Sequence, residues 1–277
     1  MTNLDFSPDE LINLNKYPIS DVNSQEFKDL VQKCREQFDD AVSCHLEGFL
    51  KPEVAAFLAE QVAQQEPNAN RYDSQRGAYN LEDAKAGLEY HKQMDPDDER
   101  LMLHRRYQRW LGTDDLMNTA LMKLYQWPNL THFVSEILDQ KPLYTIDDPL
   151  MKILVNVNGQ GDELGWHVDS HDFAVTLLLQ AAENGGLYQY VPLTGPGDKY
   201  FDEVPKLFKG DESLVRTVPM TAGSLVIFRG RNTLHRVTPV ESEDLRFLAV
   251  FAYEPVPNRI FNDSFKQNVL GRTQPRI

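Results

Sequence analysis

The chain is poor in cysteine and in basic residues, and it has no long apolar run. Its 277 residues include two cysteines, and 42 acidic residues outnumber 28 basic ones, which gives a formal net charge of −14 at pH 7. Cysteine is too scarce for a disulfide framework, as is typical of a reducing compartment. The negative charge argues against a nucleic-acid or anionic-membrane partner. No apolar run approaches the roughly 18 residues of a membrane span. We therefore expect a cytoplasmic protein that binds neither nucleic acid nor membrane.

The rest of the composition is ordinary. Hydrophobic residues make up 41% and charged residues 25% of the chain, a globular mix in a chain long enough to bury a sizeable core. There is no internal repeat, no low-complexity segment and no obvious linker. We expect one domain, residues 1–277, and the sequence leaves the oligomeric state open, with a homodimer as one option.

Residues 1–140 are predicted to form a mostly helical layer. Apolar side chains recur at helical spacing in the segments Phe27–Phe38, Val54–Val62, Met117–Leu124 and Phe133–Leu138. The polar stretch Asn68–Gly87 has no clear period, and a loop of that length in a compact domain is usually functional or disordered. Within it, we expect Arg71–Arg76 to form a lid. The basic "HRRYQRW" at residues 104–110 is interpreted as a solvated helix face.

The second half has the pattern of short strands. Runs rich in β-formers, punctuated by glycine and proline, are "KILVNVN", "AVTLLLQ", "LYQYVP", "SLVIF" and "FLAVFAY". Many short strands without alternating helices predict a β sandwich or barrel rather than parallel βαβ units. We expect a β core over residues 150–255, followed by a C-terminal segment, 256–277.

A metal-site pattern lies in "ELGWHVDSHDF", residues 163–173. On a strand, side chains at i and i+2 point to one face, so His167 and Asp169 project together. They supply two ligands of a 2-His-1-carboxylate site, which is typical of non-haem Fe(II). The best third ligand is His235 in "NTLHRVTPV", just before another β run.

A lone His-x-carboxylate is a weak signal. His45-Leu46-Glu47 has the same form, and we interpret it as ordinary N-terminal structure. An open iron site, however, needs a bidentate co-substrate, and a dicarboxylate needs a buried cation at its far end. Arginine fits because its planar fork matches a carboxylate. Arg246 follows His235 on a predicted strand; taken singly it is an ordinary surface arginine, but in this order it is the best anchor.

The run from about Lys152 to Tyr253 resembles the Fe(II)/2-oxoglutarate-dependent dioxygenases, with His-x-Asp, then "HRVTPV", then the arginine. The resemblance implies a mainly β fold with N-terminal helices: a double-stranded β-helix (a cupin-like jelly-roll) buttressed by helices. It also implies Fe(II), 2-oxoglutarate and O2 as cofactors, with Arg246 as the 2-oxoglutarate anchor. Many relatives carry a tyrosine where Asn158 stands, so any co-substrate contact by Asn158 would be made through its amide.

More narrowly, "WHVDSHDFAVTLLLQ", "GGLYQYVP", "FRGRNTLHRVTPV" and "VLGRT" resemble a bacterial group of radical halogenases and hydroxylases that act on free amino acids. In those halogenases a glycine replaces the carboxylate ligand and leaves a position for chloride. Here that position is Asp169, so the resemblance implies hydroxylation, with succinate and CO2 as co-products.

The substrate is the least determined part. A free amino acid needs an arginine and an acidic partner, and we expect the lid residues Arg71 and Arg76 to supply the former; both are otherwise ordinary loop residues. For a cationic side chain, as in lysine (the leading candidate), Asp172 is a possible carboxylate, or else the cap of a turn. The alternatives are another small molecule, a peptide-bound residue, and a jelly-roll binding protein without catalysis.

Overall fold

The computed structural model describes residues 6–78, 95–192 and 204–276. The helices are α1 (Pro8–Leu11), α2 (Gln25–Ala41), α3 (Pro52–Ala63), α5 (Thr113–Leu116), α6 (Ala120–Tyr125), α7 (Pro128–Leu138) and α9 (Asp263–Leu270). Short 3-10 turns are η1 (Glu66–Asn68), η2 (Glu99–Leu101) and η3 (Gly230–Asn232). No helix within the described residues is long and apolar enough to cross a membrane.

Strands dominate the remainder of the described chain. They are β1 (Ser43–Leu46), β2 (Asn70–Gly77), β3 (Leu103–Leu111), β4 (Tyr144–Thr145), β5 (Ile153–Asn158), β6 (Glu163–His167), β7 (Ala174–Gln180), β8 (Tyr188–Val191), β9 (Arg216–Val218), β10 (Leu225–Phe228), β11 (Leu234–Val237), β12 (Arg246–Phe251) and β13 (Tyr253–Glu254). A small separate ladder pairs β13 with β4.

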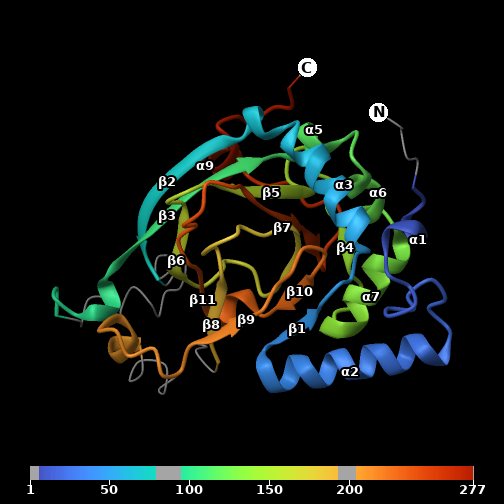
Figure 1. Ribbon diagram of the computed structural model, residues 1–277, viewed down its shortest axis with the longest axis horizontal. Helices are drawn as coiled ribbons and strands as arrows, with labels where there is room; N and C mark the ends of the chain where they lie inside the picture. The colour runs from blue at the N-terminus through green and yellow to red at the C-terminus, as the bar shows by residue number, and fades with distance from the viewer. Residues whose placement is uncertain (1–5, 79–94, 193–203, 277) are drawn as a thin grey trace.

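The large sheet is antiparallel and rolls into a nearly closed barrel. Its order is β1-β10-β7-β12-β5-β3-β6-β11-β8-β9, with β2 paired to β3. Strand β3 pairs with β5 through residues 109–111 and with β6 through residues 106–107, so it joins the two halves of the barrel. Figure 1 looks into the ring of strands, with the N-terminal helices on one side. The expected jelly-roll with buttressing helices is confirmed.

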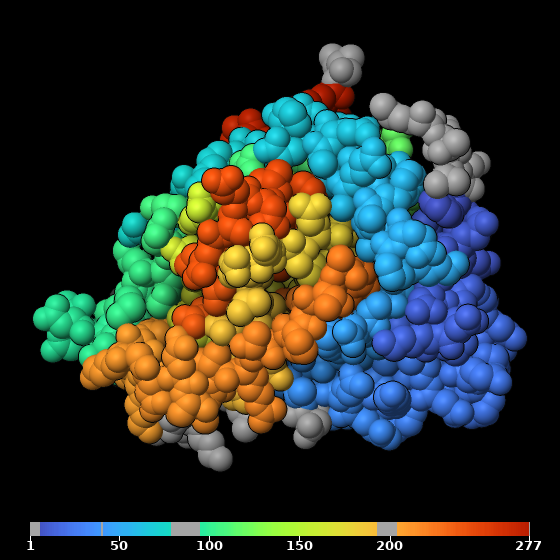
Figure 2. Space-filling view, in the orientation of Figure 1, coloured from blue at the N-terminus to red at the C-terminus, as the bar shows by residue number. Residues whose placement is uncertain are grey.

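The main core lies between the N-terminal helices and the outer face of the barrel. Strand β5 shows why: Val155 and Val157 are fully buried in this core, whereas Asn156 and Asn158 between and after them point into the barrel. The same alternation in β7, β10 and β12 gives the barrel one apolar outer face. Figure 2 shows the blue N-terminal segments along one side, with strands of the second half at the surface beside them.

Two segments differ from the sequence-based expectation. The expected lid, Arg71–Arg76, lies within the strand β2, and "HRRYQRW" is not a helix face but part of β3. Residues 79–87 of the longer polar stretch lie outside the described residues. The strand pattern was concealed because β2 and β3 carry polar side chains on both faces, so apolar alternation, the usual signal of a strand, is missing.

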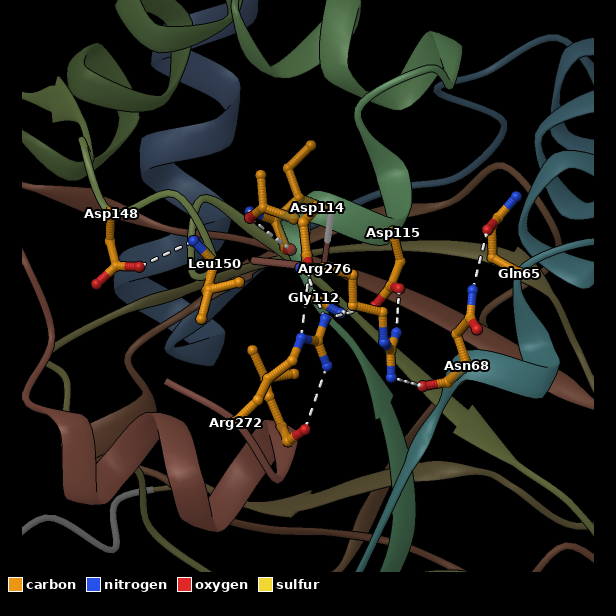
Figure 3. A network of polar contacts seen from close by, with 12 residues as sticks. Gln65, Asn68, Gly112, Asp114, Asp115, Asp148, Leu150, Arg272 and Arg276 are labelled. Atoms are coloured by element: carbon orange, nitrogen blue, oxygen red, sulfur yellow. Dashed lines mark hydrogen bonds and ion pairs between the residues drawn. The ribbon is translucent and has the colours of Figure 1, made fainter. Parts of the chain in front are cut away.

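The C-terminal segment is fastened to the barrel by ion pairs (Figure 3). Arg272, just after α9, lies 2.6 Å from an Asp114 oxygen and 2.8 Å from an Asp115 oxygen. Arg276 also pairs with Asp115 and donates to the Asn68 carbonyl oxygen. Two arginines therefore neutralise two largely buried carboxylates and hold α9 against β2 and β3.

Candidate active site

The structure brings His167, Asp169 and His235 together. Strands β6 and β11 pair with His235 directly opposite His167, and the two imidazole centroids are 4.0 Å apart. Oδ1 of Asp169 lies 3.6 Å from Nε2 of His167 and 3.7 Å from Nε2 of His235. One potential ligand atom from each of the three residues lies within 4.8 Å of the other two. Two nitrogens and one oxygen on one side of a cavity form a facial triad.

Asp169 lies in the loop after β6, because β6 ends at His167. Its side chain is therefore positioned by the loop and not by the strand that the spacing predicted. The Asp169 amide donates a 3.0 Å hydrogen bond to the Gly230 carbonyl. A Cβ at position 230 would come within 2.2 Å of the Asp169 carboxylate. The carboxylate can take this position because residue 230 has no side chain.

Both imidazoles are held in the tautomer that a metal requires. The Nδ1 atoms of His167 and His235 each lie 2.8 Å from a backbone carbonyl oxygen, of Gly165 and Thr233 respectively. A carbonyl oxygen can only accept, so Nδ1 carries the proton and Nε2 keeps its lone pair. Burial, and then the proximity of His235 and Arg106, lower the pKa of His167 well below its usual value. His167 is therefore neutral, as a ligand must be. The donor set fits Fe(II).

Arg246 lies inside the barrel at the start of β12, opposite Asn158 on β5. It is 2% exposed, and its Nη1 lies 3.4 Å from the Asn158 side-chain oxygen. Burial lowers the pKa of Arg246 to about 10, so the guanidinium stays charged at neutral pH. It forms no ion pair with a carboxylate of the described residues. A buried cation is costly unless it is paired, so this site fits an anionic group such as a carboxylate.

Two further buried polar groups lie at the site, Tyr188 beside His235 and Asn158 beside Arg246. The Tyr188 hydroxyl and the Asn158 amide nitrogen are buried and have no hydrogen-bond partner within the described residues. Gly186 makes room here, because an added Cβ would lie 2.8 Å from Cδ of Arg246. Sequence reasoning missed Tyr188, although the Gly-Gly turn before β8 marked the strand that carries it.

A cavity of about 460 Å³ connects the triad with Arg246. The antiparallel register of β2 and β3 places one set of alternate side chains on its wall: Tyr72, Arg76, Arg106, Gln108 and Trp110. Arg76 thus faces the cavity. Arg71 is on the opposite face of β2, 2.5 Å from Asp162 and 2.5 Å from Asp73. Asp172 is exposed, 2.9 Å from Arg231, and is not part of the lining.

Arg106 is a cavity residue that sequence reasoning missed. Its Nη2 donates to the Gly77 carbonyl oxygen, while its Nε is buried without a partner among the described residues. Burial, and then the charge of Arg76, lowers the pKa of Arg106. Arg76 and Arg106 thus place two cations on one wall of the cavity, and neither has a carboxylate partner in the described part of the chain. Alternate side chains of β2 and β3 face the cavity, but few of them are apolar, so the sequence did not show the alternation that would have placed Arg106 there.

Comparison with known proteins agrees with this geometry. The family model described as HalD, halogenase D, matches residues 106–259, more than half of the chain. The chain therefore belongs to the halogenase D family. No curated protein matches it.

Solved structures share the fold at low sequence identity. The 2-oxoglutarate-dependent epimerase SnoN from nogalamycin biosynthesis is 15% identical, with 82% of this chain and 83% of that chain covered and a TM-score of 0.54. A prolyl hydroxylase from Trichoplax adhaerens, in complex with a peptide of hypoxia inducible factor, is 14% identical (85% and 94% covered, TM-score 0.52). HygX from Streptomyces hygroscopicus, with nickel and 2-oxoglutarate bound, is 13% identical (81% and 87% covered, TM-score 0.52). Identities this low establish the jelly-roll fold alone.

The family, the fold and the triad together define the class of the protein. It is an Fe(II)/2-oxoglutarate-dependent oxygenase of the halogenase D family. At the position where the resemblance to amino-acid halogenases implies a glycine, this chain has a carboxylate, Asp169.

Proposed function

We propose that the protein hydroxylates an unactivated C–H bond of a free amino acid, with L-lysine as the leading candidate. The observation that carries the proposal is the position of Asp169, whose Oδ1 lies 3.6 and 3.7 Å from the two Nε2 atoms. An oxygen ligand occupies the place that a halide would need. Hydroxylation is therefore the expected outcome, although the family is described by its halogenases.

In this proposal His167, Asp169 and His235 hold the iron, and Arg246 binds the distal carboxylate of 2-oxoglutarate, with Asn158 beside it. When bound, iron, 2-oxoglutarate and O2 supply the oxidant that attacks the C–H bond, with succinate and CO2 as co-products. The apolar walls of the barrel exclude water around the reacting groups, which protects the reaction from side products.

Arg76 and Arg106 are the proposed site for the α-carboxylate of the substrate. Both line the cavity, and neither has a carboxylate partner within the described residues. Two guanidinium groups near one carboxylate give charge-assisted hydrogen bonds and fix its orientation. Arg71 and Asp172, also considered from the sequence, lie off the cavity wall, and we assign them no contact with the substrate.

A second candidate is an oxygenase of another small molecule or of a peptide-bound residue. The observation that keeps this candidate is the range of proteins with this fold, which includes a prolyl hydroxylase with a bound peptide and an enzyme of nogalamycin biosynthesis. A binding protein without catalysis is disfavoured, because it has no need for a metal triad next to a buried, unpaired arginine.

An oxygen-triggered substrate screen tests the proposal. The protein is loaded anaerobically with Fe(II) and 2-oxoglutarate, each free amino acid is added in turn, and oxygen is admitted. We expect one amino acid to raise succinate formation well above the level without substrate and to gain one oxygen atom by mass spectrometry. If no free amino acid does so while a peptide or another small molecule does, the second candidate is correct.

A further inference from the structure

The carboxylate ligand Asp169 is carried by the loop between β6 and β7, residues 168–173, whereas the two histidine ligands lie in the strands β6 and β11. The hydrogen-bonded ladder of a sheet fixes the direction of strand side chains. A loop residue has no such ladder. Ser170 and His171 of the same loop line the cavity. The position of the carboxylate therefore depends on the contacts that hold this loop.

The short turn η3 holds the loop at three points. The amide of Asp169 donates a 3.0 Å hydrogen bond to the carbonyl oxygen of Gly230. Arg231, the next residue of η3, donates through Nη2 to the carbonyl oxygen of Ser170. Its Nε lies 2.9 Å from Oδ1 of Asp172. The planar fork of one guanidinium therefore joins two acceptors of the loop, one of them directly after the ligand.

Arg231 holds the loop from outside the cavity. It is not one of the lining residues, and its side chain is 56% exposed, while that of Asp172 is 82% exposed. An ion pair this exposed adds little to the stability of the whole fold. Its effect is local, because the contact with the Ser170 carbonyl restricts the backbone beside the ligand. Ordering a loop costs conformational entropy, so a loop that is already held binds a metal more tightly.

We propose that Arg231 is a positioning residue for the metal ligand Asp169. It touches neither the metal nor the substrate and acts through the backbone of the loop. Gly230 leaves space for the carboxylate, and Arg231 keeps the loop in the place where that carboxylate meets the two imidazoles. Asp172, which the sequence suggested as a substrate contact, is a partner of Arg231 instead. The proposal concerns metal binding and does not depend on which substrate is oxidised.

Arg231→Ala separates positioning from simple electrostatics, because the two predict opposite changes in metal affinity. Loss of a nearby positive charge would by itself raise the affinity for a cation, whereas a loosened carboxylate lowers it. The probe is Co(II), which binds such sites more tightly than Fe(II), measured by equilibrium dialysis. We expect the affinity to fall about tenfold, as is typical when a partner of a metal ligand is lost. Arg231→Lys, which keeps the charge but not the fork, should recover part of the loss. The exposed Arg216→Ala in β9 is the control and should bind as wild type.

A double-mutant cycle shows whether the effect passes through the ligand. If Arg231 acts through Asp169, adding Arg231→Ala to Asp169→Ala should cause no further loss of Co(II) affinity. The visible absorption of bound Co(II), which reports the geometry of its ligands, should change in Arg231→Ala and not in Arg216→Ala. The unfolding temperature of the metal-free protein should stay at the wild-type value in both. Unchanged or higher affinity in Arg231→Ala, or an equal further loss in the Asp169→Ala background, would overturn the proposal.

Discussion

The side chains of His167 and His235 face each other across the β6–β11 pair, with 4.0 Å between the ring centroids. Nδ1 of His167 donates to the carbonyl oxygen of Gly165 in the same strand, and Nδ1 of His235 donates to that of Thr233, just before β11. Backbone carbonyl groups therefore fix the tautomer of both rings, and Phe228 packs edge-to-face on the His235 ring at 4.9 Å. Two imidazoles fixed in this way offer their Nε2 lone pairs to one ion before any ion arrives.

His167→Ala and His235→Ala are each expected to abolish turnover, because losing one of three protein ligands leaves iron loosely held. The thermal unfolding temperature without metal should change little, since the barrel does not need iron to close. Iron affinity, measured by equilibrium dialysis, should fall in both variants. Near-normal 2-oxoglutarate consumption by either variant would refute the assignment of the triad.

Arg246→Lys is expected to keep the buried charge but lose the planar fork that matches a carboxylate. The apparent KM for 2-oxoglutarate should rise by about tenfold or more, with the affinity for the primary substrate much less affected. Steady-state kinetics with each substrate varied in turn will separate the two effects. An unchanged 2-oxoglutarate requirement would mean that the anchor lies elsewhere.

Gly230→Ala is expected to weaken iron binding without unfolding the barrel. The new Cβ would lie 2.2 Å from Oδ2 of Asp169, so the carboxylate must move. Gly159→Ala is a matched control, because a Cβ there meets nothing closer than 3.4 Å. Iron titration and thermal unfolding should show a loss of metal affinity in Gly230→Ala alone. Wild-type iron affinity in that variant would show that the Asp169 position is not constrained in this way.

Arg272→Ala is expected to destabilise the fold by about 2–3 kcal/mol, because it removes charge-assisted hydrogen bonds from two largely buried carboxylates. Arg276 would still compensate Asp115 in part. Urea unfolding measures the free-energy change, and Arg216→Ala, which removes an exposed arginine from β9, serves as the control. Stability equal to wild type would show that the ion pairs in Figure 3 do not hold the C-terminal segment.

The sequence predicted best those features for which the residue type and the surrounding pattern indicated the same structure. The β core was predictable because apolar alternation marks strands such as β5 and β12, and the triad was predictable because its order along the chain follows a known pattern. The strands β2 and β3 were missed because most of their inward side chains, Arg106 among them, are polar. Residues at such a site break the apolar periodicity from which strands are recognised.

Contacts between distant parts of the chain were also beyond the sequence. Nothing local indicates that Arg71 would pair with Asp162 while Arg76, five residues later, would face the cavity. That difference depends on which face of β2 packs against the barrel, and a shift of one residue in register would exchange them. The approach of Gly230 to Asp169 has the same origin, in the pairing of segments far apart in sequence.

Asp169 carries the central claim, that this member of the halogenase D family is a hydroxylase. Asp169→Gly should open a ligand position, lose most hydroxylation and, with chloride present, give at most a minor chlorinated product. Formation of such a product also depends on how close the substrate lies to the halide, so the amount of chlorination in this variant is a secondary readout. Hydroxylation by Asp169→Gly at the wild-type rate would remove the carboxylate from the ligand set.

The most direct measurement is product analysis of the wild-type enzyme with the amino acid found in the screen, in the presence of 2-oxoglutarate, chloride and isotopically labelled O2. The product should carry one oxygen atom, with label derived from O2, and no chlorine, and succinate should form in equal amount. A chlorinated product from the unmodified enzyme would contradict the account.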